Sequence, residues 1–319
     1  MKHRIVLDTD MGTDVDDALC LALAVASPEI ELVAVTTVSG DSRLRAHIAR
    51  RLLELAGRED VPVFAGEQRT RTTGQDTFAW HGGEGEGILA RGISTRVESE
   101  PAPKAIVRLL RANDDLELVA VGPMTNLAAV LDEDPSLSSR CRQLTIMGGH
   151  VRGIEYGGHT FAHGVDYNLC SDPESSLRTL RAPFPTRLVT GDVTLQTWMG
   201  PDDLARIAAA ATPFHRAIEL AVRHWTPIQR RIFGDLGARI RDDNVAFLHD
   251  PLALACVHDE SFCTFEDLAI EPAVRNGVFR TLEVEPSASA RVMRCAIAVD
   301  AARFREHFVE RVAAFRPQR

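Results

Sequence analysis

Five carboxylates lie within ten residues near the start of the chain, in the segment Asp8-Thr9-Asp10-Met11-Gly12-Thr13-Asp14-Val15-Asp16-Asp17. Side chains this close repel one another unless a cation or shared protons offset their charge. Carboxylate oxygens are hard ligands, which favour Ca²⁺ or Mg²⁺ over zinc. The spacing of these aspartates therefore predicts a divalent metal site.

Other interpretations of the acidic segment fit less well. Helix capping accounts for one or two of the aspartates but not for five. An EF-hand does not fit, because Gly12 lies one residue early and the closing bidentate glutamate is missing. A phosphohydrolase of the haloacid dehalogenase type also begins with an Asp-x-Asp after its first strand, as at Asp8 and Asp10. Such enzymes use a lysine to steady the phosphoryl group, and this chain has only Lys2 and Lys104, so this interpretation is the main alternative.

Alternating strands and helices must position the acidic segment. Ile5 to Asp8 is a short apolar run typical of a buried strand, and Asp16 begins a helix that stops before Ser27-Pro28. The same patterns predict strands at Glu31 to Val38, Val61 to Phe64, Leu116 to Val121, Gln143 to Met147 and Thr186 to Val189, and helices at Ser42 to Ala56, Ala102 to Leu110 and Thr125 to Leu131. This alternation predicts an α/β fold with an open, mostly parallel, Rossmann-like sheet and helices on both faces. The active site would lie at the carboxyl ends of the strands.

The bulk composition narrows the class of protein. The 319 residues are 45% hydrophobic and 25% charged, and the net charge of -9 argues against nucleic acid or an anionic membrane as a partner. The longest apolar run, Ala18 to Ala26, is too short to cross a bilayer, and the amino terminus lacks a signal-like apolar stretch. No repeat or convincing linker divides the chain, so residues 1–319 are predicted to form a single domain of a cytoplasmic protein.

The acidic segment is also where the chain resembles a known family. From Val6 to Ala18 it is similar to the amino-terminal signature of the inosine-uridine nucleoside hydrolase family, with two extra residues before the paired aspartates. Other segments resemble the family's later motifs in the same order: Val38-Ser39-Gly40-Asp41, Leu53 to Gly66, His81-Gly82-Gly83-Glu84-Gly85, Val121 to Ala128, Ile146-Met147-Gly148-Gly149, Asp166-Tyr167-Asn168 with Asp172-Pro173-Glu174, and Leu248 to Ala253. The resemblance implies an enzyme of nucleoside catabolism and salvage. It would hydrolyse the N-glycosidic bond of purine and pyrimidine ribonucleosides to ribose and free base.

The resemblance also implies roles for individual residues. Asp10 would be the general base, and His249 would protonate the leaving base, since the pKa of histidine lies near neutral pH. The bound ion would be Ca²⁺ in preference to Mg²⁺, held by Asp10, Asp17, Asp250 and the backbone carbonyl of Thr125. The ribonucleoside would be bound by Asp16, Asp41, His81, Met147, Asp166, Asn168 and Asp250. A homodimer or homotetramer is expected on the same grounds.

Taken singly, several of these residues also have a purely structural interpretation. His249 could donate to a backbone carbonyl, and Met147 could fill the core. Asn168 could form an Asx turn, and Asp250, which precedes a proline, could be a turn residue. The ordered motifs favour the functional interpretation of Asp250 and Asn168. His224-Trp225 could line the base pocket or belong to an ordinary amphipathic helix.

The chain departs from the family's pattern at the sugar site. Asp41 stands where asparagine is usual, Asp166 where glutamate is usual and Glu84 where aspartate is usual, while Asp14 is an additional carboxylate without an assigned role. The hypothesis that follows is an altered contact to the 5′-hydroxyl of the ribose. Two other classes of function stay open. A metal-dependent phosphohydrolase would release phosphate, and a non-catalytic nucleoside-binding protein would bind without turnover.

Overall fold

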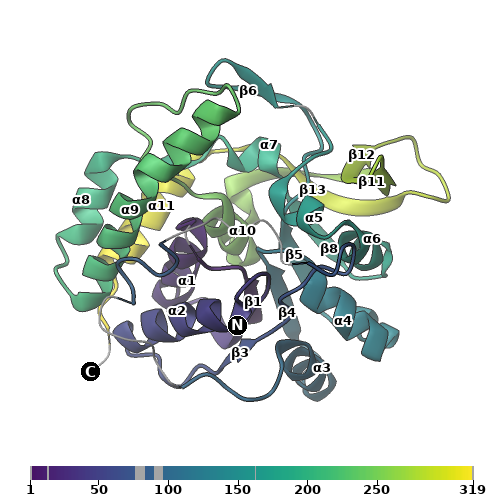
Figure 1. Cartoon of the computed structure of the whole chain (residues 1–319), viewed down its shortest axis with the longest axis horizontal. Helices are drawn as coiled ribbons and strands as arrows, with labels where there is room; N and C mark the ends of the chain where they lie inside the picture. Colours follow the sequence, from purple (N-terminus) through teal and green to yellow (C-terminus); the bar gives the residue numbers. More distant parts are fainter. Residues whose placement is uncertain (1, 13, 76–82, 90–95, 162, 318–319) are drawn as a thin grey trace.

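The computed structural model describes residues 2–12, 14–75, 83–89, 96–161 and 163–317. At its centre lies a nine-stranded sheet (Figure 1). From one edge to the other the strands are β12 (Val278–Glu283), β11 (Cys263–Arg275), β13 (Arg291–Val299), β8 (Thr186–Val189), β5 (Gln143–Met147), β4 (Leu116–Ala120), β1 (His3–Thr9), β2 (Ile30–Thr37) and β3 (Val63–Ala65). Neighbouring strands are parallel except where β11 runs antiparallel to β12 and β13. The predicted mostly parallel α/β sheet is confirmed.

Helices cover both faces of this sheet. Ile5 and Leu7 belong to one hydrophobic core and Val6 to another, because successive side chains of a strand face opposite ways. The first core includes residues of α1 (Asp16–Ala26), α2 (Ser42–Leu55), α8 (Pro201–Ala208), α9 (Pro213–Asp235), α10 (His249–His258) and α11 (Ala301–Ala314). The second includes residues of α3 (Ala102–Ala112), α4 (Thr125–Glu133) and α6 (Pro173–Arg181). Strands buried on both faces explain the continuous apolar runs of the sequence.

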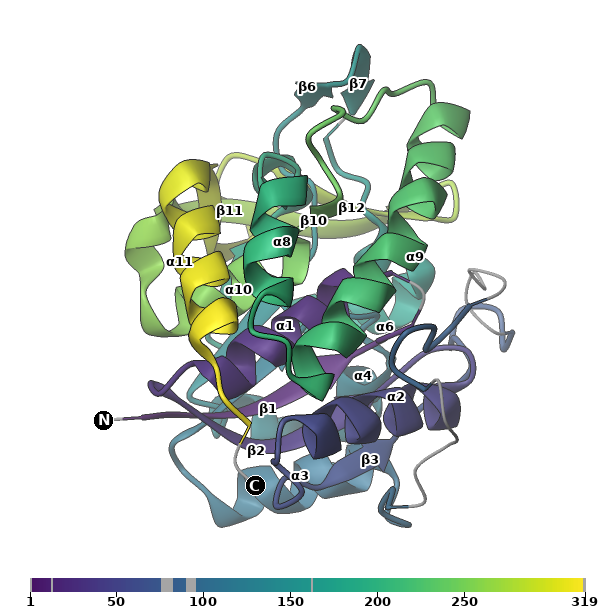
Figure 2. The same ribbon diagram turned by 90° about the vertical axis from the view of Figure 1, so that its left-hand side faces the viewer.

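Several short elements extend from this framework. The hairpin of β6 (Ile154–Tyr156) and β7 (His159–Phe161) stands apart from the main sheet, near the end of α9 (Figure 2). Other short elements are β9 (Trp198–Met199), β10 (Ala246–Phe247), α5 (Tyr167–Ser171), α7 (Gly191–Thr194) and the 3-10 turns Pro135–Ser139 and Glu260–Phe262. Within the described ranges, no helix combines the length and the apolar character that crossing a bilayer requires.

The order of the strands reverses next to β1. From β1 the chain continues to β2 and β3 on one side of the sheet, and to β4, β5 and β8 on the other. Ligands of open α/β sheets bind in the crevice at the carboxyl ends of the strands at such a point. The acidic cluster extends from the end of β1 through the connecting segment into the first turn of α1, so the fold places it at this crevice.

Candidate active site

Residues from distant parts of the chain meet in one cavity of about 420 Å³ at the carboxyl edge of the sheet. Most of the predicted site residues line it, namely Asp10, Asp16, Asp17, Met147, Asp166, Asn168, His249 and Asp250. Glu84 and the unassigned Asp14 line it as well. The fold therefore brings together motifs that lie up to 240 positions apart, between Asp10 and Asp250.

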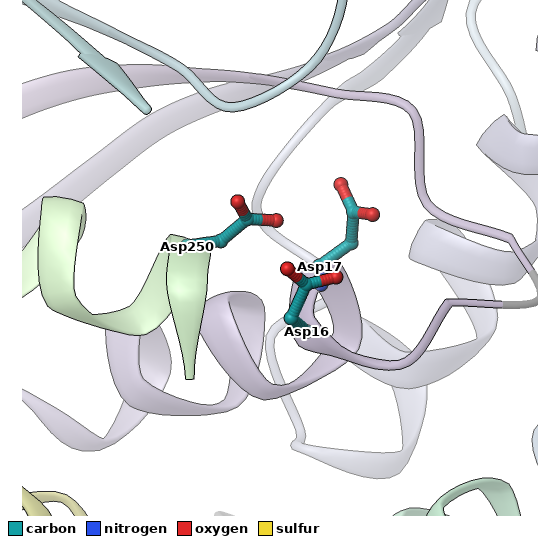
Figure 3. Close-up of side chains that lie close together, drawn as sticks. All are labelled: Asp16, Asp17 and Asp250. Carbon is teal, nitrogen blue, oxygen red and sulfur yellow. The ribbon is translucent and has the colours of Figure 1, made fainter. Parts of the chain in front are cut away.

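Three buried carboxylates that line the cavity form a compact group. Asp16 and Asp17 lie in the first turn of α1 and Asp250 in the first turn of α10, and Figure 3 shows their side chains close together. Carboxylate oxygens of the three residues lie within 4.8 Å of one another. The positive ends of the two helix dipoles favour negative charge at this place.

The electrostatics of this group call for a cation. Burial raises the pKa of Asp17, and the charge of Asp10 raises it further. Burial also raises the pKa of Asp250, followed by the charges of Asp17 and Asp10. All donors in the group are hard carboxylate oxygens, so the residues present fit a Ca²⁺ or Mg²⁺ ion, which would relieve their mutual repulsion.

Asp8, the first member of the acidic cluster, has a different position. Its Oδ1 accepts hydrogen bonds from the hydroxyl of Thr36 at 2.6 Å and from Nδ2 of Asn126 at 2.7 Å. It is absent from the described residues that line the cavity, and burial raises its pKa to about 7. Of the five aspartates, one thus bonds to neighbouring elements beside the cavity, and the other four line the cavity.

Arg45 is a cavity residue that sequence reasoning missed. It lies on α2, is buried, and lines the cavity beside the acidic segment. Its Nε donates to the carbonyl of Ser39 at 2.8 Å, and its Nη1 donates to the backbone carbonyl of Asp10. A Cβ at Gly12 would lie too close to Nη1 of this guanidinium, so another residue there would require the arginine side chain to shift. A signal was available, since an arginine on the buried face of a helix needs polar partners.

His249 begins α10 and has a well-defined environment. Its Nδ1 lies 2.7 Å from the hydroxyl of Thr194, and its ring stacks on Phe247 with centroids 4.9 Å apart. Burial lowers its pKa to about 4, so the ring is neutral near pH 7. Because Thr194 occupies Nδ1, Nε2 is the ring nitrogen left for a ligand in the cavity.

The predicted sugar residues are anchored to the backbone. Nδ2 of Asn168 donates to the carbonyl of Val121 at 2.8 Å and to that of Met147 at 3.1 Å. Asp166 caps α5, and its two oxygens accept from the peptide N–H groups of Gly149 at 2.7 Å and Leu169 at 3.1 Å. Burial raises the pKa of Asp166 to about 6. Both residues therefore fix the loops around the cavity as well as lining it.

Three predicted residues are not among the described residues that line the cavity. Asp41 is exposed and caps α2 by accepting from the N–H of Leu44 at 2.9 Å, and it is not among the described cavity residues, so its position does not support a sugar contact. Thr125 begins α4, and its hydroxyl donates to Asp172 at 2.9 Å. The side chain of His81 lies outside the described residues.

Apolar and aromatic side chains also line the cavity. They are Phe161, Val165, Tyr167, Leu195, Trp225, Ile232, Phe233 and Leu236. Trp225 thus lines the cavity, as one interpretation of the sequence predicts. Aromatic faces stack on flat heterocycles, so the cavity combines carboxylates that suit a cation and hydroxyl groups with aromatic side chains that suit a base.

Comparisons with known proteins agree with this arrangement. The model of the inosine-uridine preferring nucleoside hydrolase family matches residues 5–306. An uncharacterized protein of Schizosaccharomyces pombe is 31% identical over 247 residues, 76% of this chain and 78% of the relative. The pyrimidine-specific ribonucleoside hydrolase RihB of Escherichia coli is 29% identical over 257 residues, 78% of this chain and 79% of the relative.

Solved structures show the same fold. A plant nucleoside hydrolase superposes with a TM-score of 0.84 at 25% identity, over 98% of this chain and 100% of that one. The purine-preferring ribonucleoside hydrolase of Gardnerella vaginalis gives a TM-score of 0.83 at 25% identity, over 98% of both chains. With its family match across nearly the whole sequence, the chain belongs to the inosine-uridine preferring nucleoside hydrolase family.

Proposed function

We propose that this chain hydrolyses the N-glycosidic bond of ribonucleosides, releasing ribose and the free base. The observation that carries the proposal is one cavity of about 420 Å³ whose lining combines buried carboxylates with aromatic side chains. Its carboxylates suit a cation and the diol of a ribose, and its aromatic wall suits the base. Two of the relatives, RihB and the Gardnerella protein, are named ribonucleoside hydrolases, which supports the same reaction here.

We infer that the resident cofactor is a divalent cation, Ca²⁺ in preference to Mg²⁺. Asp10, Asp17, Asp250 and the backbone carbonyl of Thr125 would hold it. Asp16 lies in the same carboxylate group, where it would bind the ribose hydroxyls beside the ion. Several carboxylates together with a carbonyl favour the larger ion. When bound, such a cation lowers the pKa of a coordinated water and orients the ribose diol.

Asp10 is proposed as the general base. Its carboxylate takes a proton from water as the water oxygen forms a bond to C1′ of the ribose and the C1′–N bond breaks. Burial raises the pKa of Asp10, which makes it a stronger base than an exposed aspartate. Arg45 holds the peptide carbonyl of the same residue, so the base has a fixed position.

His249 is proposed to assist the leaving base, which receives the electron pair of the broken bond. A neutral imidazole carries one N–H. If the hydroxyl of Thr194 donates to Nδ1, that N–H lies on Nε2 and donates to the departing base. Asn168, Asp166 and Met147 would complete the ribose site.

We further propose a cytoplasmic homodimer or homotetramer that acts on small-molecule nucleosides and has no nucleic-acid or membrane partner. The cysteines support the location, since all six are free thiols, as is usual in a reducing compartment. The net charge of -9 supports the absence of polyanionic partners.

Ribose release from inosine, adenosine, guanosine, uridine and cytidine, with and without a chelator, tests this function. Release should stop on chelation and return with calcium, and Asp10→Asn should abolish it. The substitution Asp267→Asn, at an exposed carboxylate on β11, is the matched control. Phosphate release from nucleotides without ribose release would favour a phosphohydrolase instead. Nucleoside binding without release would favour a binding protein.

A further inference from the structure

Two buried cysteines contact each other at the carboxyl-terminal end of α10. Cys256 lies in the last turn of this helix and is fully buried, whereas Cys263 begins β11 and is 9% exposed. The 3-10 turn Glu260–Phe262 lies between them and brings α10 next to the start of β11. The thiol of Cys256 donates to Sγ of Cys263, and the two sulfurs lie 3.7 Å apart. Neither cysteine is among the described residues that line the cavity, so the proposed hydrolysis does not use this pair.

The environment of this pair differs from that of three other thiols. Each of those three thiols donates to a backbone carbonyl: Cys141 to Gln143 at 3.2 Å, Cys170 to Phe279 at 3.2 Å, and Cys295 to Met293 at 3.5 Å. Cys170 is the most exposed of the six cysteines, because it is half-buried and the others are buried. The chain therefore separates two properties that govern oxidation, since the most exposed thiol is not one of the two whose sulfurs contact each other.

The contact gives the two sulfurs different roles. The pKa of Cys256 is raised, first by its hydrogen bond to Cys263 and then by burial, so its thiol keeps the proton and acts as the donor. Cys263 accepts this hydrogen bond and is the more exposed of the two. A small oxidant would therefore react first with Cys263, and Cys256 would be the second thiol. A reactive cysteine beside a second thiol is the usual arrangement of a redox-sensitive pair.

We propose that Cys256 and Cys263 form a reversible oxidation site, which a peroxide converts to an intramolecular disulfide. The sulfur of Cys263 attacks one oxygen of hydrogen peroxide, the O–O bond breaks, and a sulfenic acid and one water are formed. The sulfur of Cys256 then attacks the sulfenic sulfur. The S–S bond forms as the S–O bond breaks, and the thiol proton leaves with the hydroxide as a second water. The two thiols together lose two electrons, which reduce the peroxide.

The geometry allows this bond to form with a small movement. A disulfide bond is about 2.05 Å long, so sulfurs that lie 3.7 Å apart need to approach by about 1.7 Å. The bond would tie the last turn of α10 to β11, and the first turn of the same helix carries His249 and Asp250. Disulfides of reducing compartments are usually transient, which agrees with a site that a reductant returns to two thiols.

Peptide mapping of the whole protein tests this proposal. The wild type is treated with hydrogen peroxide, the remaining thiols are alkylated in denaturant, and the chain is cut after glutamates, including Glu260 between the two cysteines. Cys256 and Cys263 should then lie in two peptides that stay joined until a reductant separates them. Cys141 and Cys295 should be recovered as alkylated thiols. Retention of both thiols of the pair while Cys170 is oxidised would show that exposure governs the reaction, and would overturn the proposal.

Single substitutions assign the two roles. In Cys256→Ala, oxidation of Cys263 should stop at the sulfenic acid, which dimedone traps as an adduct, and no joined peptides should form. Cys170→Ala is the matched control and should form the joined peptides as the wild type does. Thermal unfolding verifies that each variant is folded, and the wild-type map decides the proposal if one is not. Sulfinic acid at Cys263 of the wild type without joined peptides would also overturn it, as would a disulfide from Cys263 to any cysteine other than Cys256.

Discussion

The hydrogen bond between Thr194 and His249 allows a direct test of the role proposed for the histidine. Thr194→Val removes the hydroxyl that lies 2.7 Å from Nδ1 and keeps the shape of the side chain. The other contact of this hydroxyl, to the carbonyl of Gly191 at 3.5 Å, is long and therefore weak. One hydrogen bond of this kind is worth about 0.5–1.5 kcal/mol. If it orients the ring for the departing base, kcat for inosine should fall by about two- to tenfold.

The assay compares two ribosides whose leaving groups differ in their need for a proton. Hypoxanthine leaves more readily with a hydrogen-bond donor, whereas 4-nitrophenolate leaves as a stable anion. Thr194→Val should therefore lower kcat for inosine more than for 4-nitrophenyl riboside. Thr264→Val, at an exposed position of β11, is the matched control. An equal fall for both substrates would indicate a general disturbance around α10, and an unchanged kcat for inosine would refute the role of Thr194.

Other parts of the site give further predictions. Arg45→Met removes charged hydrogen bonds to two backbone carbonyls, so the free energy of unfolding measured in urea should fall by about 2–4 kcal/mol. The value of kcat should also fall, because the backbone of Asp10 loses this contact. An unchanged unfolding midpoint would contradict this prediction. Asp250→Asn removes one charge from the carboxylate group and should weaken calcium binding by about tenfold or more in calorimetry, whereas Asp267→Asn should not. Burial raises the pKa of Asp166 to about 6. The free-energy cost of burying the ionised side chain is therefore absent below about pH 4. This cost grows between about pH 4 and pH 6 and is constant above pH 6. In chelator-treated protein, the unfolding free energy of the wild type relative to Asp166→Asn should fall by roughly 3 kcal/mol between pH 4 and pH 7, and a difference that does not change with pH would argue against it.

The six parallel strands β1, β2, β3, β4, β5 and β8 could be predicted from the sequence, because they are mostly buried on both faces. The predicted bounds of β5 and β8 agree with the structure. The predicted strand at Val61 begins two residues too early, since the paired residues of β3 begin at Val63, after a proline that has no N–H for the ladder.

The last third of the chain could not be predicted in the same way, because its strands are partly exposed and lack a clear apolar run. β11 contains Pro272, which usually argues against a central strand. The structure explains this proline: β11 pairs with β13 only over Cys263–Ile270, so Pro272 has a partner strand on one side alone. The pairing of β11 depends on contacts with residues distant in the sequence, which a local sequence pattern does not predict.

The candidate site likewise contains residues that the sequence predicts and residues that it does not. Motif order indicated Asp10, Asp17, Asp250 and His249, and the fold brings them to one cavity. The contribution of Arg45 depends on how α2 packs against the acidic segment, which spacing along the chain does not reveal. The surface position of Asp41 could not be predicted for the same reason, since it lies in the motif but its side chain caps a helix.

Calcium titration into chelator-treated protein tests the central claim most directly, with ion binding and ribose release from inosine measured in the same samples. The structure has one buried group of three carboxylates within its described residues, so one ion per chain should bind, and release should rise in proportion to the fraction of chains that hold it. Ribose release at full rate before any ion is bound would contradict the proposed metal dependence. Full occupancy of the calcium site without ribose release from inosine or any other nucleoside would contradict the proposed hydrolysis.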